Sequence, residues 1–151
     1  GLVESERVHF QRVCGGDGRE LGARLQRGLR AGTLTGHPSL STAIGNDIGG
    51  DFVFAQQLYV LGRPGDVLLG ISTSGNARNV ILAAQVAHAS NLQVVSLTGK
   101  EGGALKDLST VSICAPAGET HRIQEYHVPI YHCLCAMLEC EFFGDDRRDS
   151  R

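Results

Sequence analysis

Short apolar runs alternate with amphipathic segments from residue 51 onward. Near-continuous apolar runs such as 66–71 are typical of strands that are buried on both faces of a parallel sheet. Apolar residues at three- and four-residue spacing between these runs predict helices. The pattern predicts strands at 66–71, 92–98 and 110–115, and helices at 51–61, 77–90, 104–108 and 121–143. Because strands and helices alternate, we expect an α/β fold whose doubly wound parallel sheet is covered by helices on both faces.

The residues before position 51 give a weaker pattern. Residues 8–13 predict a short strand. Residues 19–31 predict a helix that carries four arginines, Arg19, Arg24, Arg27 and Arg30. The simplest interpretation of these arginines is a helix face in contact with water. Residues 40–44 predict another short strand, which ends in Gly45-Asn46-Asp47.

Three hydroxyl residues, Ser72, Thr73 and Ser74, follow the predicted strand 66–71 and precede a helix that begins near Ala77. The first backbone N–H groups of a helix have no partner inside the helix, and the helix dipole favours negative charge there. Parallel sheets bind their ligands beyond the carboxyl ends of the strands, where this turn lies. The turn therefore fits a phosphate site for a small neutral metabolite. The alternative is a Ser/Thr-rich helix cap that binds no ligand.

Composition limits the classes of protein that fit. The chain has 151 residues, enough for one domain with a hydrophobic core. Its formal net charge of −2 gives no reason to expect a nucleic-acid or membrane-surface partner. No apolar run is long enough to span a membrane and no signal peptide is recognised, so we expect a cytoplasmic protein. The five cysteines form no C-x-x-C motif, which favours reduced thiols. The charged tail 144–151 is expected to be disordered.

Four segments together resemble the sugar isomerase (SIS) domain and, within it, the phosphoheptose isomerase family. They are IGNDIGGDFVFAQQL at 44–58, GISTSGNARNVILAAQVA at 70–87, VVSLTGKEGGALKDLSTVSICAP at 94–116 and HRIQEYHVPIYHCLCAMLE at 121–139. The TSGN turn is common to SIS domains. GND, LTGKxGG and RIQExH in combination are typical of phosphoheptose isomerases and their close non-enzymatic relatives.

The resemblance implies a single SIS domain over 1–151, with a flavodoxin- or Rossmann-like three-layer α/β/α sandwich that assembles as a homotetramer. It also implies an aldose–ketose isomerase that converts sedoheptulose 7-phosphate to D-glycero-D-manno-heptose 7-phosphate through an enediolate. This reaction serves bacterial heptose and lipopolysaccharide biosynthesis. Zinc is bound in some members of the family, and no organic cofactor is implied.

The resemblance also implies which residues bind the substrate. By matching position, Ser72, Thr73 and Ser74 would hold the phosphate and the sugar hydroxyls next to it. Asn46 and Asp47 of the GND motif would contact the sugar.

Isomerisation of this kind needs a base that removes the proton next to the carbonyl and an acid that protonates the enediolate oxygen. The resemblance assigns Glu20, in the segment 19–25, as the base and His132 as the acid. Gln124 would contact the substrate, and Glu20, Gln124 and His132 would ligate zinc. Gln124 and His132 lie about 12 Å apart along a helix, so we expect an active site shared between subunits. His127 is expected to be structural.

The chain departs from the family pattern at three places. Residues 14–18 read CGGDG where the family has a glycine-rich phosphate loop followed by a histidine, so the N-terminal part is atypical or truncated. Ala77 stands where the family has a serine, which removes a hydrogen bond to phosphate of about 0.5–1.5 kcal/mol. His121 replaces an acidic or small residue.

These departures leave a second function open. The alternative is a phosphosugar-binding SIS module that acts through protein–protein interaction without catalysis, of the type that associates with the replication initiator. Such a module needs the Ser/Thr turn but neither Glu20 nor His132.

Overall fold

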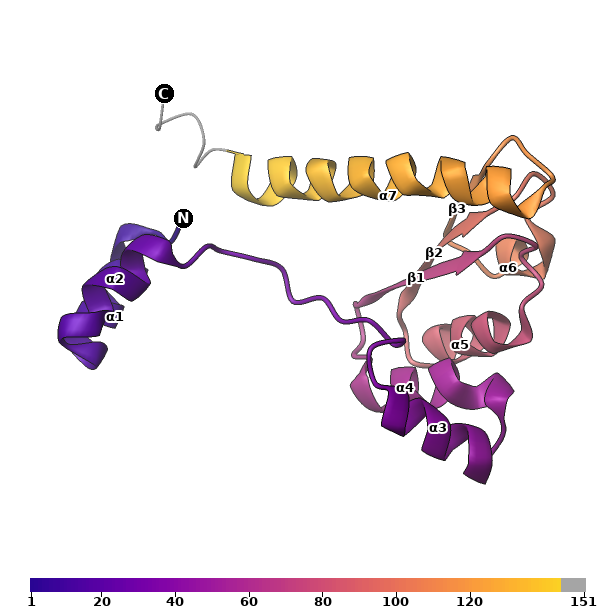
Figure 1. The fold of residues 1–151 in the computed structure, drawn as a ribbon, viewed down its shortest axis with the longest axis horizontal. Coiled ribbons are helices and arrows are strands. Elements are labelled where there is room, and N and C mark those ends of the chain that lie inside the picture. Colours follow the sequence, from indigo (N-terminus) through magenta and orange to yellow (C-terminus); the bar gives the residue numbers. More distant parts are fainter. Residues whose placement is uncertain (145–151) are drawn as a thin grey trace. The chain divides into compact units, whose positions relative to one another are not determined.

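The computed structural model describes residues 1–144 and divides into two compact units (Figure 1). Of the described residues, the first unit holds 1–32 and 133–144, and the second holds 33–132. No helix within residues 1–144 is both long enough and apolar enough to cross a membrane. Apart from Gly144, the predicted tail lies outside the described residues.

A parallel sheet of three strands forms the middle of the second unit. In spatial order the strands are β1 (Val67–Ser72), β2 (Gln93–Thr98) and β3 (Val111–Cys114). The three predicted strands are therefore confirmed, and so is the α/β fold with a parallel sheet. Ser72 lies opposite Thr98, and Thr98 lies opposite Cys114, so the carboxyl ends of the strands meet at one edge of the sheet.

Helices connect and cover the strands of this unit. They are α3 (Pro38–Asp47), the 3-10 helix η1 (Gly50–Phe52), α4 (Val53–Leu61), α5 (Arg78–Ala89), α6 (Gly103–Asp107) and the first turns of α7 (Thr120–Phe143). The helix predicted at 51–61 is divided between η1 and α4, and the other predicted helices of this unit begin and end within one or two residues of their observed bounds. Figure 1 shows α5 and the start of α7 on opposite faces of the sheet.

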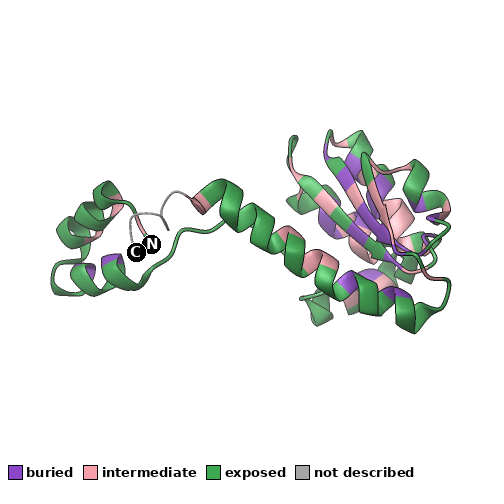
Figure 2. Cartoon of the chain, turned by 90° about the horizontal axis from the view of Figure 1, so that it is seen from above, coloured by how far each residue is buried: buried purple, intermediate pink, exposed green. Residues whose placement is uncertain are grey.

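The hydrophobic core lies between the sheet and helices α4, α5 and α6. Its buried members are Leu58, Ala83, Ala84, Ala87, Leu92, Val94 and Leu105. The alanines of α5 are short enough for the helix to approach the strands closely. Gly70 of β1 allows the same close approach from the strand side, because a Cβ there would lie 3.2 Å from Val80. In Figure 2 the buried residues gather on the strands and on the helix faces that contact them. This close packing fixes where α5 begins relative to the end of β1.

The second face of the sheet is covered only near the carboxyl ends of the strands. There, Ile123 and His127 of α7 are 3 % and 4 % exposed, and His127 Nε2 donates to the carbonyl oxygen of Thr98 at 3.0 Å. His127 is thus a structural residue, as expected. Further back along β1, Val67, Leu69 and Ile71 are exposed. The expectation that β1 is buried on both faces is wrong, because no described element covers this part of the sheet.

The N-terminal predictions are wrong in two places within the first unit. Residues 8–13 belong to the helix α1 (Glu4–Cys14), and the predicted helix 19–31 is replaced by α2 (Gly16–Arg24). Helix α1 begins where Glu6 accepts a hydrogen bond from the backbone N–H of Val3 at 2.9 Å. Such capping, with acidic residues in the first turn, favours a helix here over a short strand. Helix α2 ends because Leu25 adopts an extended backbone.

The predicted strand 40–44 is also helical and lies inside α3. Pro38 occupies the first turn, where its fixed backbone angle and missing N–H favour the start of a helix. Thr42 adds a hydrogen bond from its hydroxyl to the carbonyl oxygen of Pro38 at 2.8 Å. A run of five residues is too short to distinguish a strand from a helix.

Candidate functional site

The last residue of β1, Ser72, carries a hydroxyl that no described residue hydrogen-bonds. Ser72 is 7 % exposed and lies on the same face of β1 as Gly70, the face that α5 covers. Alternation along a strand therefore directs Ser72 toward the start of α5. The hydroxyl oxygen itself stays open to solvent, since Gln57 Oε1 is the only fully buried side-chain oxygen or nitrogen without a partner in residues 1–144. The Ser72 hydroxyl is therefore free to bind a polar ligand next to the helix start.

The start of α5 leaves backbone donors open. Ala77 precedes the helix with an extended backbone and provides no side-chain cap. The N–H of Val80 is satisfied by Ala77 O at 3.1 Å and by Asn79 Oδ1 at 2.9 Å. Among the described residues, nothing accepts from the N–H groups of Arg78 and Asn79. These two groups and the Ser72 hydroxyl are the donors that an anion at this turn would use.

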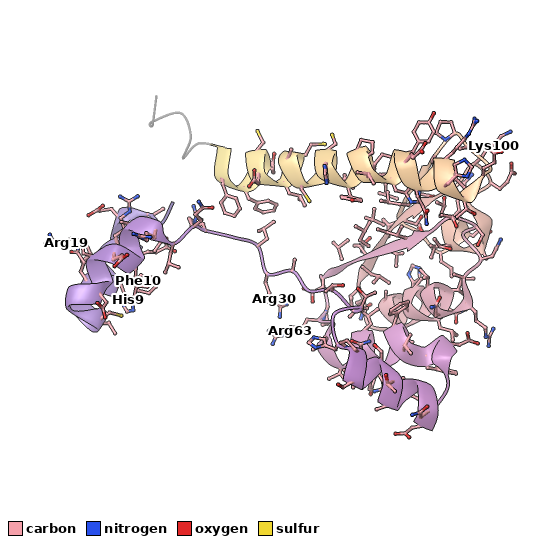
Figure 3. All side chains as sticks on the ribbon, viewed as in Figure 1. His9, Phe10, Arg19, Arg30, Arg63 and Lys100 are labelled. Atoms are coloured by element: carbon pink, nitrogen blue, oxygen red, sulfur yellow. The ribbon has the colours of Figure 1, made fainter. Side chains whose placement is uncertain are left out.

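The loop after β2 holds the turn after β1 in place. The N–H of Gly99 donates to Thr73 O at 2.9 Å, and the N–H of Leu105 donates to Gly75 O at 2.9 Å. Gly75 has a left-handed backbone with a φ of 66°, and a Cβ on it would overlap the carbonyl oxygen of Gly102. The glycines of STSGN and LTGKEGG are thus explained by direct contact between two backbones. Lys100, in the same loop, is labelled in Figure 3.

Asn76 adds side-chain hydrogen bonds to this contact. Its Oδ1 accepts from the N–H of Ala104 at 3.0 Å, and its Nδ2 donates to Ser74 O at 3.2 Å. The Ser74 hydroxyl accepts from the N–H of Asn76 at 3.1 Å and keeps its own proton free to donate. Sequence reasoning missed Asn76 because its partner lies 28 residues away. The signal that could have found it is the pairing of TSGN with a second glycine-rich loop.

Asn46 and Asp47 lie at the end of α3 and are exposed. The chain then turns at Gly49, whose φ is 110°, and enters η1, which packs against both α3 and α5. Asp51 of η1 pairs with Arg78 at 3.2 Å between Oδ2 and Nε. The segment that follows the GND motif is thereby connected to the start of α5, next to the hydroxyl turn.

The candidate catalytic residues lie on two helices. Gln124 and His132 are both exposed on α7, about 12 Å apart along its axis. The His132 ring meets the Tyr131 ring edge-on, with 4.8 Å between their centres. Glu20 lies on α2 of the first unit and pairs with Arg24 at 2.9 Å. Nowhere in residues 1–144 do three His, Cys, Asp or Glu side chains form a group that could hold a metal ion.

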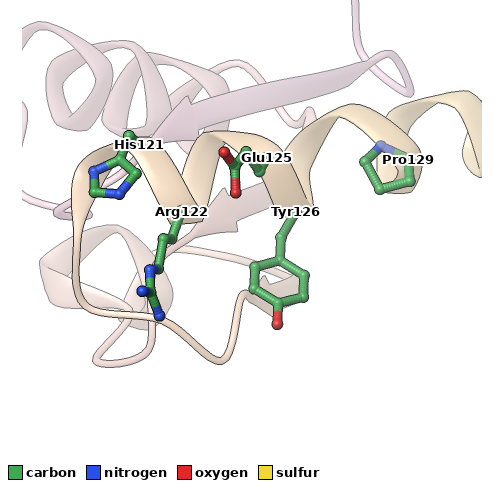
Figure 4. Close-up of a pocket in the computed structure, with 5 residues that line it drawn as sticks. All are labelled: His121, Arg122, Glu125, Tyr126 and Pro129. Carbon is green, nitrogen blue, oxygen red and sulfur yellow. The ribbon is translucent and has the colours of Figure 1, made fainter.

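A shallow, open depression of about 670 Å³ lies on the outer side of α7 (Figure 4). Its lining residues are His121, Arg122, Glu125, Tyr126 and Pro129. All five belong to one helix, and Arg122 pairs with Glu119 at 2.9 Å. None of the residues assigned to substrate binding or catalysis lines it, so the depression is not part of the candidate site.

Cys114 ends β3 at the same edge of the sheet as the hydroxyl turn. The Thr98 hydroxyl donates to its sulfur at 3.4 Å. This hydrogen bond and a second one with Ser112 lower the pKa of the Cys114 thiol, while burial acts in the opposite direction. All five cysteines are free, as expected for reduced thiols.

Comparisons with known proteins agree with this architecture. The family model described as the SIS domain matches residues 22–99. The phosphoheptose isomerase of Thiobacillus denitrificans is 50 % identical over 120 residues, which cover 78 % of this chain and 61 % of the relative. That of Akkermansia muciniphila is 43 % identical over 116 residues, covering 77 % and 61 %. The chain spans about three fifths of the length of the curated relatives that it matches.

Solved structures show the same likeness. The phosphoheptose isomerase from Neisseria gonorrhoeae has 46 % sequence identity and a TM-score of 0.72, covering 74 % of this chain and 62 % of that protein. The phosphoheptose isomerase from Francisella tularensis has 38 % identity and a TM-score of 0.71, covering 74 % and 60 %.

The contact between the two loops can be tested by a single methyl group. Gly75→Ala places a Cβ against Gly102 O and also strains a left-handed backbone. We expect the free energy of unfolding to fall by about 3 kcal/mol or more, measured by urea denaturation of the full chain. Gly65→Ala is the matched control: its φ is 89° but no atom lies within 4 Å of the added Cβ. It should lose only about 1 kcal/mol, and equal losses in the two variants would contradict a tight contact.

Proposed function

The chain belongs to the SIS domain family, and on this premise we propose that it is an aldose–ketose isomerase acting on a phosphorylated heptose. The observation that carries the proposal is the Ser72 hydroxyl, which bonds to no described residue and lies at the end of β1 next to the uncapped start of α5. A phosphate group supplies the acceptors that these donors lack. The similarity to phosphoheptose isomerases supports sedoheptulose 7-phosphate as the substrate and D-glycero-D-manno-heptose 7-phosphate as the product.

The proposed site binds the substrate at both ends. Ser72, Thr73 and Ser74 hold the phosphate, which takes no part in the reaction. Asn46 and Asp47 contact the sugar hydroxyls, and Gln124 contacts the substrate from α7. Binding energy from the phosphate end then positions the carbonyl end between the catalytic groups.

Two side chains carry the proposed chemistry. The Glu20 carboxylate removes a proton from the carbon next to the ketose carbonyl, and the electron pair of that C–H bond forms the carbon–carbon double bond of the enediolate. His132 protonates the oxygen that becomes negative. Return of the carbon-bound proton to the neighbouring carbon, with loss of a hydroxyl proton, gives the aldose. Glu20 must exchange its partner Arg24 for the substrate, and this exposed ion pair is weak enough to allow that.

Zinc enters no step of this mechanism. Glu20, Gln124 and His132 are the candidate ligands, but the described part of the chain gathers no three-residue group of metal-binding side chains. Acid–base chemistry by Glu20 and His132 is complete without the ion.

The wider setting is also part of the proposal. We propose a cytoplasmic homotetramer that supplies heptose phosphate for bacterial lipopolysaccharide biosynthesis. The separation of Gln124 and His132 along α7 supports a site to which more than one subunit contributes. A phosphosugar, not nucleic acid or a membrane, is the proposed partner, in line with the net charge of −2.

Proton exchange tests the reaction directly. Incubation with sedoheptulose 7-phosphate in heavy water should place deuterium on the substrate carbon. NMR measures this incorporation. Glu20→Gln should abolish exchange while substrate binding, measured by calorimetry, remains. His132→Asn should lower kcat by about 100-fold or more, since general acid–base groups contribute about 10²–10⁴-fold.

His121→Asn is the matched control on the same helix and should retain turnover within about twofold, since it removes a histidine with no proposed role. Tight binding of the sugar phosphate by the unaltered protein without any exchange would contradict the isomerase proposal. Exchange that survives Glu20→Gln would contradict the assignment of the base.

Mixing two inactive variants tests whether subunits share the site. Glu20→Gln and His132→Asn chains refolded together should recover part of the unaltered activity, because some sites then combine an intact Glu20 with an intact His132. Each variant refolded alone should stay inactive. Mixed oligomers, verified by mass spectrometry, that show no recovery would contradict a shared site, as would an active monomer.

A further inference from the structure

Arg78 carries a positive charge at the point where the hydroxyl turn meets α5. It is the first residue of α5, directly after Ala77. Its Nε lies 3.2 Å from Asp51 Oδ2, and the two side chains are 70 % and 54 % exposed. The ion pair connects η1 with α5, two elements that already pack against each other. Asp51 therefore connects the guanidinium to η1, at the first turn of the helix that follows the hydroxyl turn, and leaves the side chain largely open to solvent.

The other donors at this turn are neutral. They are the Ser72, Thr73 and Ser74 hydroxyls and the free N–H groups at the start of α5. Ala77 contributes no hydroxyl. A phosphate ester carries close to two negative charges at neutral pH, and neutral hydrogen bonds are about half as strong as charge-assisted ones. None of these donors carries a charge, whereas Arg78 carries one at the start of α5.

The geometry of arginine suits this role. A guanidinium presents its N–H groups as a planar fork that can bind two oxygens of one phosphate in parallel. The Asp51 contact uses Nε, and an exposed ion pair contributes at most about 1 kcal/mol, so the fork can be redirected to a phosphate at little cost. Arg63 precedes β1 and Lys100 follows β2. Arg63 therefore lies at the opposite end of the strands from Lys100 and from the start of α5 (Figure 3).

We propose that Arg78 binds the phosphate of the substrate and makes the site selective for phosphorylated sugars. This inference rests on the proposed isomerase function, since it names a further residue of the same site. Arg78 supplies the charged contact, and the hydroxyls and backbone groups supply the neutral ones. Asp51 positions the guanidinium before the substrate arrives.

The test compares kinetics of the full chain with sedoheptulose 7-phosphate for three variants. Arg78→Gln should raise KM about 10- to 100-fold, the range for loss of a charge-assisted hydrogen bond, with kcat changed by less than about threefold. Arg78→Lys should recover part of the loss, because it keeps the charge but not the fork. Arg63→Gln, which removes an equal charge at the far end of β1, should leave KM within about twofold. Circular dichroism verifies that each variant is folded.

Salt dependence gives a second readout. KM of the unaltered protein should rise with ionic strength more steeply than KM of Arg78→Gln, because one ion pair with the phosphate is missing in the variant. Equal KM values for Arg78→Gln and Arg63→Gln would overturn the inference, as would identical salt dependence of Arg78→Gln and the unaltered protein.

A binding measurement separates this inference from the proposed function. Calorimetry with inorganic phosphate requires no turnover. If the chain does not isomerise the sugar but binds phosphate more weakly after Arg78→Gln, the isomerase proposal fails and the role of Arg78 stands. If the chain isomerises the sugar and Arg78→Gln binds phosphate as tightly as the unaltered protein, the role of Arg78 is overturned and the isomerase proposal stands.

Discussion

The direct backbone contact between the loops that follow β1 and β2 fixes the rest of the candidate site. A Cβ on Gly75 would overlap Gly102 O and a Cβ on Gly103 would overlap Ser74 O, so neither loop has room for a side chain there. Hydrogen bonds from Gly99 to Thr73 and from Leu105 to Gly75 hold the two loops together. A rigid turn of this kind orients its donors before a ligand arrives, which lowers the entropic cost of binding.

That contact determines which groups are left over for a ligand. Asn76 and the carbonyl oxygens of the turn make the hydrogen bonds that hold the two loops together. The Ser72 hydroxyl and the first N–H groups of α5 make no such bonds and remain available to a ligand. Arg78 adds a positive charge to the first turn of α5, and its ion pair with Asp51 connects that turn to the chain that follows Asn46 and Asp47. The phosphate end of the proposed substrate thus meets a fixed structure, whereas Glu20 belongs to the other unit.

The sequence predicted the sheet well because apolar runs and the helices between them are strong, local signals. It failed for 8–13 and 40–44, where short windows gave a strand pattern but Glu6 and Pro38 start helices. The hydroxyl turn was also predictable, since both its residue types and its place after a strand carry meaning. The role of Asn76 was not, because its partner Ala104 is distant in the chain. The exposure of Leu69 depends on what covers the sheet, which no property of β1 itself specifies.

The most direct test of the account is an NMR titration of the isotope-labelled full chain with sedoheptulose 7-phosphate, using unphosphorylated sedoheptulose as the reference. We predict that the phosphorylated sugar shifts the amide signals of residues 72–79 most strongly and saturably, and that the unphosphorylated sugar leaves them nearly unchanged. Largest shifts along 121–129 of α7, with the turn after β1 unaffected, would contradict the central claim that this turn binds the phosphate.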